Sequence, residues 1–184
     1  MAKSQIEGVS ELQAFIRDQG LGAKVVTVPE SRLSVSEDAT SIDQATLYEQ
    51  LITAPQIAEV SRDLYASGFY SQAVDEAFKV VEVCIQERAG LSAPTAIALA
   101  RTAFDPNEPK LTWASLTTQS ERDEQAGYYQ IYSGSFGGIA GPVRSEIGWI
   151  SDPDIALDCI LLAQHLFRKL MMASKVTSPK ASEI

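Results

Sequence analysis

Residues 57–91, "IAEVSRDLYASGFYSQAVDEAFKVVEVCIQERAGL", decide the fold that this sequence predicts. Their apolar residues recur three and four positions apart, which is the spacing of one face of an α-helix. Gly68 divides the stretch into two such runs and Gly90 follows the second, and glycine favours the end of a helix. The stretch therefore predicts two helices, over about 55–67 and 71–88, each with one buried face.

The same helical period continues beyond this pair. A short helix is predicted over 94–104, and a fourth begins at Ser120 with Asp123 as its capping partner. The glycines at 134, 137, 138 and 141 are expected to break up this fourth helix. A last helix runs from Asp152 to about residue 175. Five helices with short connections predict an all-α bundle.

The first 54 residues differ from the rest in composition. Ile6, Val9, Leu12, Phe15 and Ile16 have the spacing of one helical face, and Ser, Thr, Asp and Glu dominate residues 30–46. We interpret residues 1–54 as an amphipathic helical or extended appendage followed by an acidic Ser/Thr-rich linker. Residues 55–175 form the helical domain, and residues 176–184 form a frayed tail.

Composition and charge exclude several classes of protein. Hydrophobic residues make up 45% of the 184 residues, a globular balance, and the formal net charge is -9. A negative chain repels a polyphosphate backbone, so charge does not support RNA as a partner. The start of the chain does not read as a secretory signal, and the longest apolar run, 156–167, is too short for a bilayer. We therefore expect a cytoplasmic protein without a membrane segment.

The cysteines and the single histidine do not indicate a metal site. Cys84 and Cys159 each lie in an apolar helical run, which favours buried, reduced thiols over a disulfide. His165 is the only imidazole available to accompany them, and no close Cys or His spacing occurs. We expect neither a metal nor a cofactor.

Three blocks of sequence carry a family resemblance. The first is the 57–91 stretch, with Gly68, Tyr70 and the Ala-Val-x-x-Ala-Phe run at 73–78; the second is "EQAGYYQIYSGSFGGIAGPVRSE" at 124–146; the third is "DPDIALDCILLAQHLFRKL" at 152–170. In order and spacing, these blocks resemble the Ymh family of prokaryotic HEPN-like domains. The resemblance covers roughly two-thirds of the chain and implies a HEPN-like helical bundle.

That resemblance also implies a chemistry whose key residues are missing here. Active HEPN domains are metal-independent ribonucleases with an Arg that stabilises charge on the phosphate and a His that transfers protons. The matching positions in this chain are Ala140 and Ser145. Arg144 does not restore the pair, because no His follows it at the required distance. We therefore expect no catalytic residue, and we expect the homodimer in which such pairs usually meet.

Four residues remain as binding candidates. Arg144 and Glu146 would contact a ligand or partner in the former active cleft, or else lie on a solvated turn. Tyr128 and Tyr132 would stack bases, although aromatic residues four apart on an amphipathic helix are more typical of a core. His165 is expected on a solvated face.

Two further groups of residues have simpler interpretations. The carboxylates Asp75, Glu76 and Glu82 are typical of a solvated helix face. Trp113 and Trp149 are expected to anchor a core or an interface.

We interpret the chain as a non-catalytic interaction or regulatory module. A phage-defence or mobile-element setting is implied by the resemblance alone, and residues 1–54 are a candidate surface for a protein partner. One alternative is a ribonuclease with a diverged active site that uses Arg144 and His165. Another is a nucleotide-binding module built on the glycines at 134–141, which lack the Lys-Ser/Thr ending of a phosphate loop.

Overall fold

The computed structural model describes residues 43–176, and all structural statements below concern that part of the chain. The amphipathic segment predicted at residues 6–16 lies outside the described residues. So do most of the acidic linker and the tail from residue 177.

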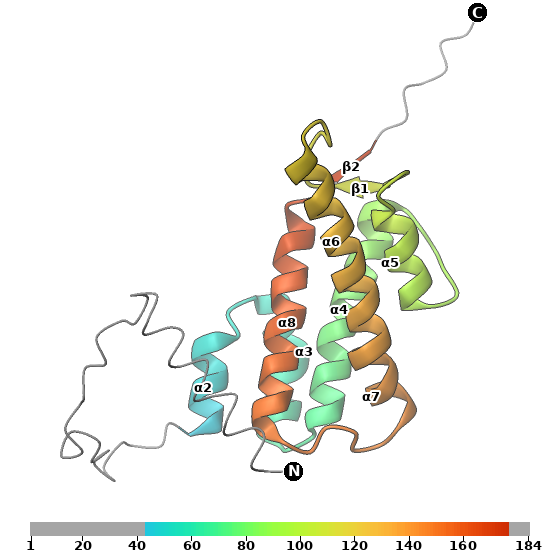
Figure 1. Ribbon diagram of the computed structural model, residues 1–184. Coiled ribbons are helices and arrows are strands. Elements are labelled where there is room, and N and C mark those ends of the chain that lie inside the picture. Colours follow the sequence, from blue (N-terminus) through green and yellow to red (C-terminus); the bar gives the residue numbers. More distant parts are fainter. Residues whose placement is uncertain (1–42, 177–184) are drawn as a thin grey trace, which may run out of the picture. The chain divides into compact units, whose positions relative to one another are not determined.

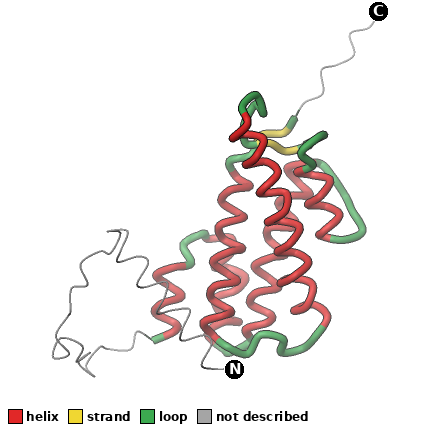
Figure 2. The backbone as a smooth tube through the Cα atoms, in the orientation of Figure 1, coloured by secondary structure: helices red, strands yellow, loops and turns green. Residues whose placement is uncertain are grey.

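The described residues form an all-α bundle, as the sequence predicts (Figures 1 and 2). Its helices and turns are α2 (Gln44–Leu51), α3 (Pro55–Ala66), α4 (Tyr70–Ala89), α5 (Ala96–Phe104), α6 (Gln119–Ser135), the π-helical turn η2 (Phe136–Ala140), α7 (Gly141–Ser145) and α8 (Pro153–Met171). The strands β1 (Leu111–Thr112) and β2 (Ser174–Lys175) pair antiparallel at one end. The five predicted helices correspond to α3, α4, α5, α6 and α8.

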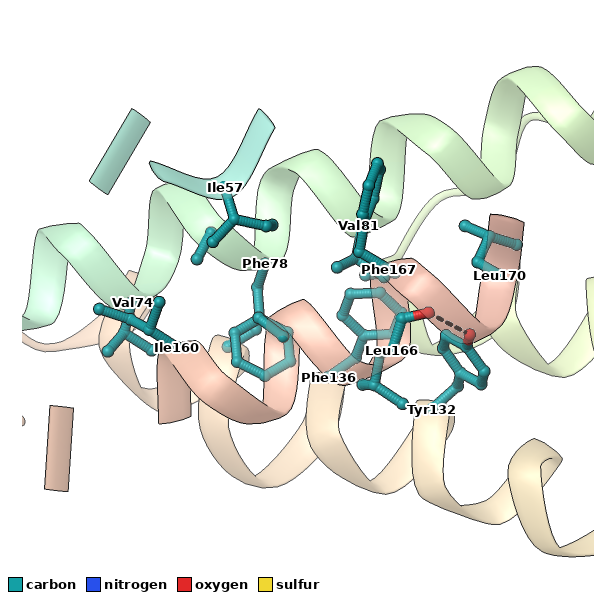
Figure 3. Packing of buried hydrophobic residues seen from close by; sticks show 14 of the residues in the cluster. Ile57, Val74, Phe78, Val81, Tyr132, Phe136, Ile160, Leu166, Phe167 and Leu170 are labelled. Carbon is teal, nitrogen blue, oxygen red and sulfur yellow. Dashed lines mark hydrogen bonds between the residues drawn. The ribbon is translucent and has the colours of Figure 1, made fainter. Parts of the chain in front are cut away.

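The core lies where α4 and α8 face each other and α6 closes one side (Figure 3). Phe78 of α4, Ile160 of α8 and Tyr132 of α6 are all fully buried. The helical period predicted these inward faces correctly, because burying each apolar side chain stabilises the fold by about 1.5–3 kcal/mol. Helix α3 covers part of the opposite side of the α4–α8 pair.

Helix α2 was not predicted, since its residues fall in the segment interpreted as linker. Tyr48 attaches it to the bundle: its ring is 1% exposed and its hydroxyl lies 2.7 Å from the Ser61 hydroxyl of α3. The loop after α2 is held by Gln164 of α8, whose Oε1 accepts hydrogen bonds from the backbone N–H groups of Thr53 and Ala54 at 2.7 Å. The Gln164 bonds join residues 110 and 111 positions apart, so local sequence patterns did not reveal them.

The start of α6 corrects another expectation. The capping box joins Thr118 and Glu121, not Ser120 and Asp123. The Thr118 hydroxyl accepts from the N–H of Glu121 at 3.3 Å, and the Glu121 carboxylate accepts from the N–H of Thr118 at 3.0 Å. Both pairs have the right spacing, but the capping box favours the longer Glu side chain, which reaches back to the capping residue.

The end of α8 also differs from the prediction. The helix stops at Met171, not near residue 175, and the chain continues into β2. Leu111 of β1 pairs with Lys175 of β2, which ties the loop after α5 to the end of α8. Two-residue strands are too short to show an alternating pattern, so they could not be predicted from the sequence.

Candidate functional site

Ala140 and Ser145, the positions that the sequence resemblance matches to the Arg/His pair, lie on one continuous helical path. Helix α6, η2 and α7 follow one another without a break from Gln119 to Ser145 (Figure 1). The prediction that glycines break this helix is therefore wrong. Each glycine costs a helix about 1 kcal/mol relative to alanine, but Tyr132, Phe136 and Ala140 bury one side of the path and outweigh that cost.

The π turn has a specific geometry at Gly141. Its N–H donates to the carbonyl of Phe136, five residues earlier, which is the hydrogen bond of a π-helix. A Cβ atom on Gly141 would lie 3.3 Å from that same carbonyl oxygen. Glycine therefore fits this position because it allows the close approach of two backbone segments.

The two positions of the missing Arg/His pair have different surroundings. Ala140 is 1% exposed and packs in the core. Ser145 is exposed at the end of α7, and its hydroxyl donates to the carbonyl of Gly141 at 2.9 Å. Glu146, directly after it, is also exposed. One position is thus part of the core and the other is on the surface.

Arg144 points at α4 and is engaged within the chain. Its Nε donates to Asp75 at 2.6 Å, and its Nη1 lies 2.9 Å from the Glu82 carboxylate. Asp75 also pairs with Lys79 at 2.8 Å. Burial alone would lower the pKa of Arg144. Its hydrogen bonds to the Asp75 and Glu82 carboxylates, and their negative charge, have the larger effect and raise that pKa. These two carboxylates, expected on a solvated face, instead hold α7 against α4.

A hollow of about 340 Å³ adjoins Arg144, and it is the nearest equivalent of an active cleft. It lies between α4, the start of α5 and the π turn, and its lining includes Glu82, Thr95, Ile97 and Phe136. Its charged lining residues are Glu82 and Arg144, which pair with each other, so the hollow offers no excess positive charge to a phosphate backbone. Neither Ala140 nor Ser145 lines this hollow.

His165 belongs to a different part of the bundle. Its Nε2 lies 2.9 Å from the Tyr128 hydroxyl, and the two rings stack with centroids 5.9 Å apart. Lys169 lies over the Tyr128 ring at 4.8 Å and pairs with Glu124 at 2.5 Å. Tyr128 and Arg144 are separated by sixteen residues of the helical path, roughly 24 Å along its axis. The structure therefore does not bring His165 and Arg144 together.

Tyr132 lies in the core next to this cluster. It is 0% exposed, its hydroxyl donates to the carbonyl of Leu166 at 2.6 Å, and its ring stacks on Phe104. Burial raises its pKa. Tyr128 is half-buried and packs against Trp113. Tyr132 thus presents no face to a base, and Tyr128 is engaged by side chains of its own chain.

The most exposed apolar surface lies at the end of the bundle where α7 is joined to α8. We call it the end patch and define it by Phe69, Ile147, Trp149 and Ile155. Ile147 is 101% exposed and the other three are each 54% exposed. Phe69 and Ile147 border a hollow of about 310 Å³, and Trp149 and Ile155 border one of about 240 Å³. Ile150 and Ser151 border both hollows, so the four side chains lie around two adjoining hollows.

The loop that carries the end patch is anchored. The Ser71 hydroxyl accepts from the N–H of Ile150 at 2.9 Å and lies 3.2 Å from its carbonyl, while the Ile150 side chain turns inward. Gly148 has φ +72°, a conformation that glycine adopts without strain. Ile147 and Trp149 are therefore held outward. In the sequence, the patch could have been found from the Ile-Gly-Trp-Ile run at 147–150, because loops between helices usually contain polar residues.

The cysteines remain free thiols. Cys84 and Cys159 are each half-buried, and burial raises the pKa of both. Within residues 43–176, no three His, Cys, Asp or Glu side chains gather into a metal-binding group. Every helix in that same range is too short or too polar to span a bilayer.

Comparison with protein families gives one match. Residues 53–170 match the family described as "Protein of unknown function (Hypoth_ymh)". Comparisons with curated proteins and with solved structures gave no match. The matched range runs from before α3 to the last residue but one of α8, and it includes Ala140, Ser145 and the end patch. Because the match covers well over half of the chain, the protein belongs to the Ymh family.

Proposed function

We propose that this protein is a non-catalytic interaction module that pairs with a second copy of itself through the end patch. The observation that supports this most directly is the full exposure of Ile147 beside Phe69, Trp149 and Ile155. Contiguous apolar side chains of this size are costly in water and mark interaction surfaces. Aromatic residues are also enriched among those that contribute most to binding.

A second copy suits the end patch for two reasons. The resemblance to HEPN domains implies a homodimer near the motif positions, and the patch begins just after Arg144. The patch also combines protruding side chains with two hollows, so one face offers both halves of a self-complementary contact, as twofold symmetry requires. Because Ser71 already fixes the loop, little conformational entropy is lost on binding.

The absence of catalysis is supported by the surroundings of the motif positions. Ala140 is in the core and Arg144 is paired with two carboxylates, so no free cation faces a substrate phosphate there. Losing a proton-transfer group and a charge-stabilising group removes about 3–5 kcal/mol each from the transition state. A diverged ribonuclease using Arg144 and His165 would need them on one phosphate, whereas His165 bonds to Tyr128, which lies roughly 24 Å from Arg144 along the helical path.

The nucleotide-binding alternative rested on the glycines at 134–141. A phosphate loop presents free backbone N–H groups, whereas these glycines lie in a helical path. That geometry favours a structural role for them. The phage-defence or mobile-element setting, and a protein partner for residues 1–54, stay predictions from the sequence.

Sedimentation equilibrium of the full chain tests the proposed pairing. We expect the wild type to be a dimer, and we expect the double variant Ile147→Ser/Trp149→Ser to dissociate at least about thirtyfold more readily, as for loss of a residue central to an interface. Ile131→Ser is the matched control, because Ile131 is 43% exposed on α6, outside the patch. A wild type that is monomeric at all concentrations, or a double variant that pairs as well as the control, contradicts the proposal.

Incubation with labelled RNA, with and without EDTA, tests the absence of catalysis. We expect the RNA to remain intact in both conditions. Cleavage that disappears in His165→Ala would show that the protein is a ribonuclease with a diverged site.

A further inference from the structure

A second apolar surface lies on the side of the bundle that α3 covers only in part. Helix α3 has 12 residues and α4 has 20, so their lengths are roughly 18 Å and 30 Å. Helix α3 buries Ile57 and Tyr65 against its neighbours, and Gln56 at its start borders a hollow of about 430 Å³. Helix α3 fills the space between α4 and α8 as far as Gln56, at its own first turn. Beyond Gln56, toward the C-terminal ends of α4 and α8, this space is open.

The side chains around this opening are mainly apolar. We call it the α4–α8 groove and define it by Val80, Val83 and Cys84 of α4 and Phe167 and Met171 of α8. Val83 and Met171 are each 49% exposed, whereas Phe167 is 8% exposed and forms the floor. The Cys84 sulfur lies 3.8 Å from the Met171 sulfur. Methionine adapts its shape to a partner, which suits a binding groove.

The shape of the groove fits a helix. It extends a space that α3, itself a helix, already occupies between the same two elements. The uncovered length is roughly 12 Å, or about two turns of helix. A helix of that length presents side chains at i, i+3, i+4 and i+7 along one apolar stripe, as in other complexes where a helix lies in a groove.

The charges at the edge of the groove determine which charged residues a bound helix would carry beside its apolar face. Glu76, Lys79 and Glu87 border it, so the edge is negative overall. Lys79 is paired with Asp75 and Glu76, both at 2.8 Å, and therefore offers little charge to an acidic partner. A bound helix would be attracted to this edge through Lys or Arg side chains beside its apolar stripe.

We propose that the α4–α8 groove binds a short amphipathic helix of a partner protein, with basic residues flanking its apolar face. This proposal does not depend on the end patch, which lies at the other end of α4 and α8. The apolar segment at residues 6–16 of this chain is a poor match in charge, because Glu7 and Glu11 lie within it. A second copy is the occupant proposed for the end patch, not for this groove.

Fluorescence anisotropy with labelled 14-residue model peptides tests this proposal on the full chain. The probe is a Leu/Lys peptide with Leu at i, i+3, i+4 and i+7; the controls are a scrambled peptide of the same composition and a Leu/Glu peptide of the same pattern. We expect the wild type to bind the Leu/Lys probe at least tenfold more tightly than either control. Equal binding of the scrambled peptide overturns the proposal, because it would reflect charge alone.

Variants locate the binding on the chain. We expect Val83→Ser to weaken binding of the Leu/Lys probe at least tenfold, while Ile131→Ser, at a similarly exposed apolar residue outside the groove, leaves it unchanged. Glu87→Lys should weaken the Leu/Lys probe and strengthen the Leu/Glu peptide. Circular dichroism and thermal unfolding check that each variant is folded. A Val83→Ser protein that is folded and binds like the wild type overturns the proposal.

Two further measurements separate the competing occupants. A labelled peptide of residues 4–19 that binds more tightly than the Leu/Lys probe would assign the groove to this chain's own segment and overturn a partner helix. The Ile147→Ser/Trp149→Ser variant should bind the probe as the wild type does. If its binding is lost instead, the groove is not an independent site.

Discussion

Arg144 lies between Asp75 and Glu82, and Ala140 is buried about one turn before it on the same helical path. The Arg144 Nε donates to Asp75 and its Nη1 pairs with Glu82, so two carboxylates offset the charge of Arg144 and weaken its attraction for another anion. The structure thus uses Arg144 to hold α7 on α4. The sequence showed that Asp75 and Glu82 are seven residues apart on one helix face, but not that Arg144, 69 residues from Asp75, lies opposite them.

Restoring the two motif residues one at a time tests their surroundings. We expect Ala140→Arg to lower the free energy of unfolding by about 3 kcal/mol or more, because it forces a charged group into the core. Ser145→His, at an exposed position, should change it by less than about 1 kcal/mol. Urea denaturation measures both. An Ala140→Arg protein as stable as the wild type would show that this position opens onto a cleft.

At the scale of elements, the helical period predicted the long helices and their buried faces. It did not predict how the glycines behave between α6 and α7. A local rule treats glycine as a helix breaker, but the outcome depends on how much apolar surface the continued helix buries. Helix α2 was missed for a related reason: it packs partly on α8, and its Gln44 bonds to Asp154, 110 residues away in the sequence.

Two alanine substitutions distinguish the glycines of the path. A Cβ on Gly134 would meet nothing within 4 Å, so Gly134→Ala should stabilise the protein by about 0.5–1 kcal/mol through the reduced entropy of the unfolded chain. Gly141→Ala should give no such gain, because its Cβ would lie 3.3 Å from the Phe136 carbonyl. Chemical denaturation measures both. Equal stabilisation at the two positions would contradict the π turn.

The capping box of α6 predicts a dependence on pH. Hydrogen bonds from the N–H groups of Thr118 and Thr117 lower the pKa of Glu121 below its ordinary value of 4.5. Since the folded-state pKa is the lower one, the stabilisation is fully present above about pH 4.5 and is lost as pH falls through the folded-state value. The gap in melting temperature between wild type and Glu121→Gln should therefore shrink from pH 7 to pH 3.

Glu146→Gln, at an exposed carboxylate after α7, is the control for a general change of charge. The same narrowing of the gap in this control would mean that net charge, not the cap, causes the effect.

At the scale of the molecule, the sequence predicted the fold class and the family, whereas the end patch was found only in the structure. The motif positions drew attention to Arg144, while the most exposed apolar surface is the end patch a few residues later. Of the four end-patch residues, only Trp149 was expected from the sequence to anchor a core or an interface. Phe69 comes 80 residues before Trp149, and Ile155 lies in α8, so only the fold shows that all three border adjoining hollows.

Amide hydrogen–deuterium exchange of the full chain at high and low protein concentration tests the pairing most directly. If the end patch joins two copies, raising the concentration should slow exchange in residues 68–72 and 146–155 while leaving α5 and the α4–α8 groove unchanged. Exchange that does not depend on concentration, or protection confined to another surface, would contradict the proposed interface.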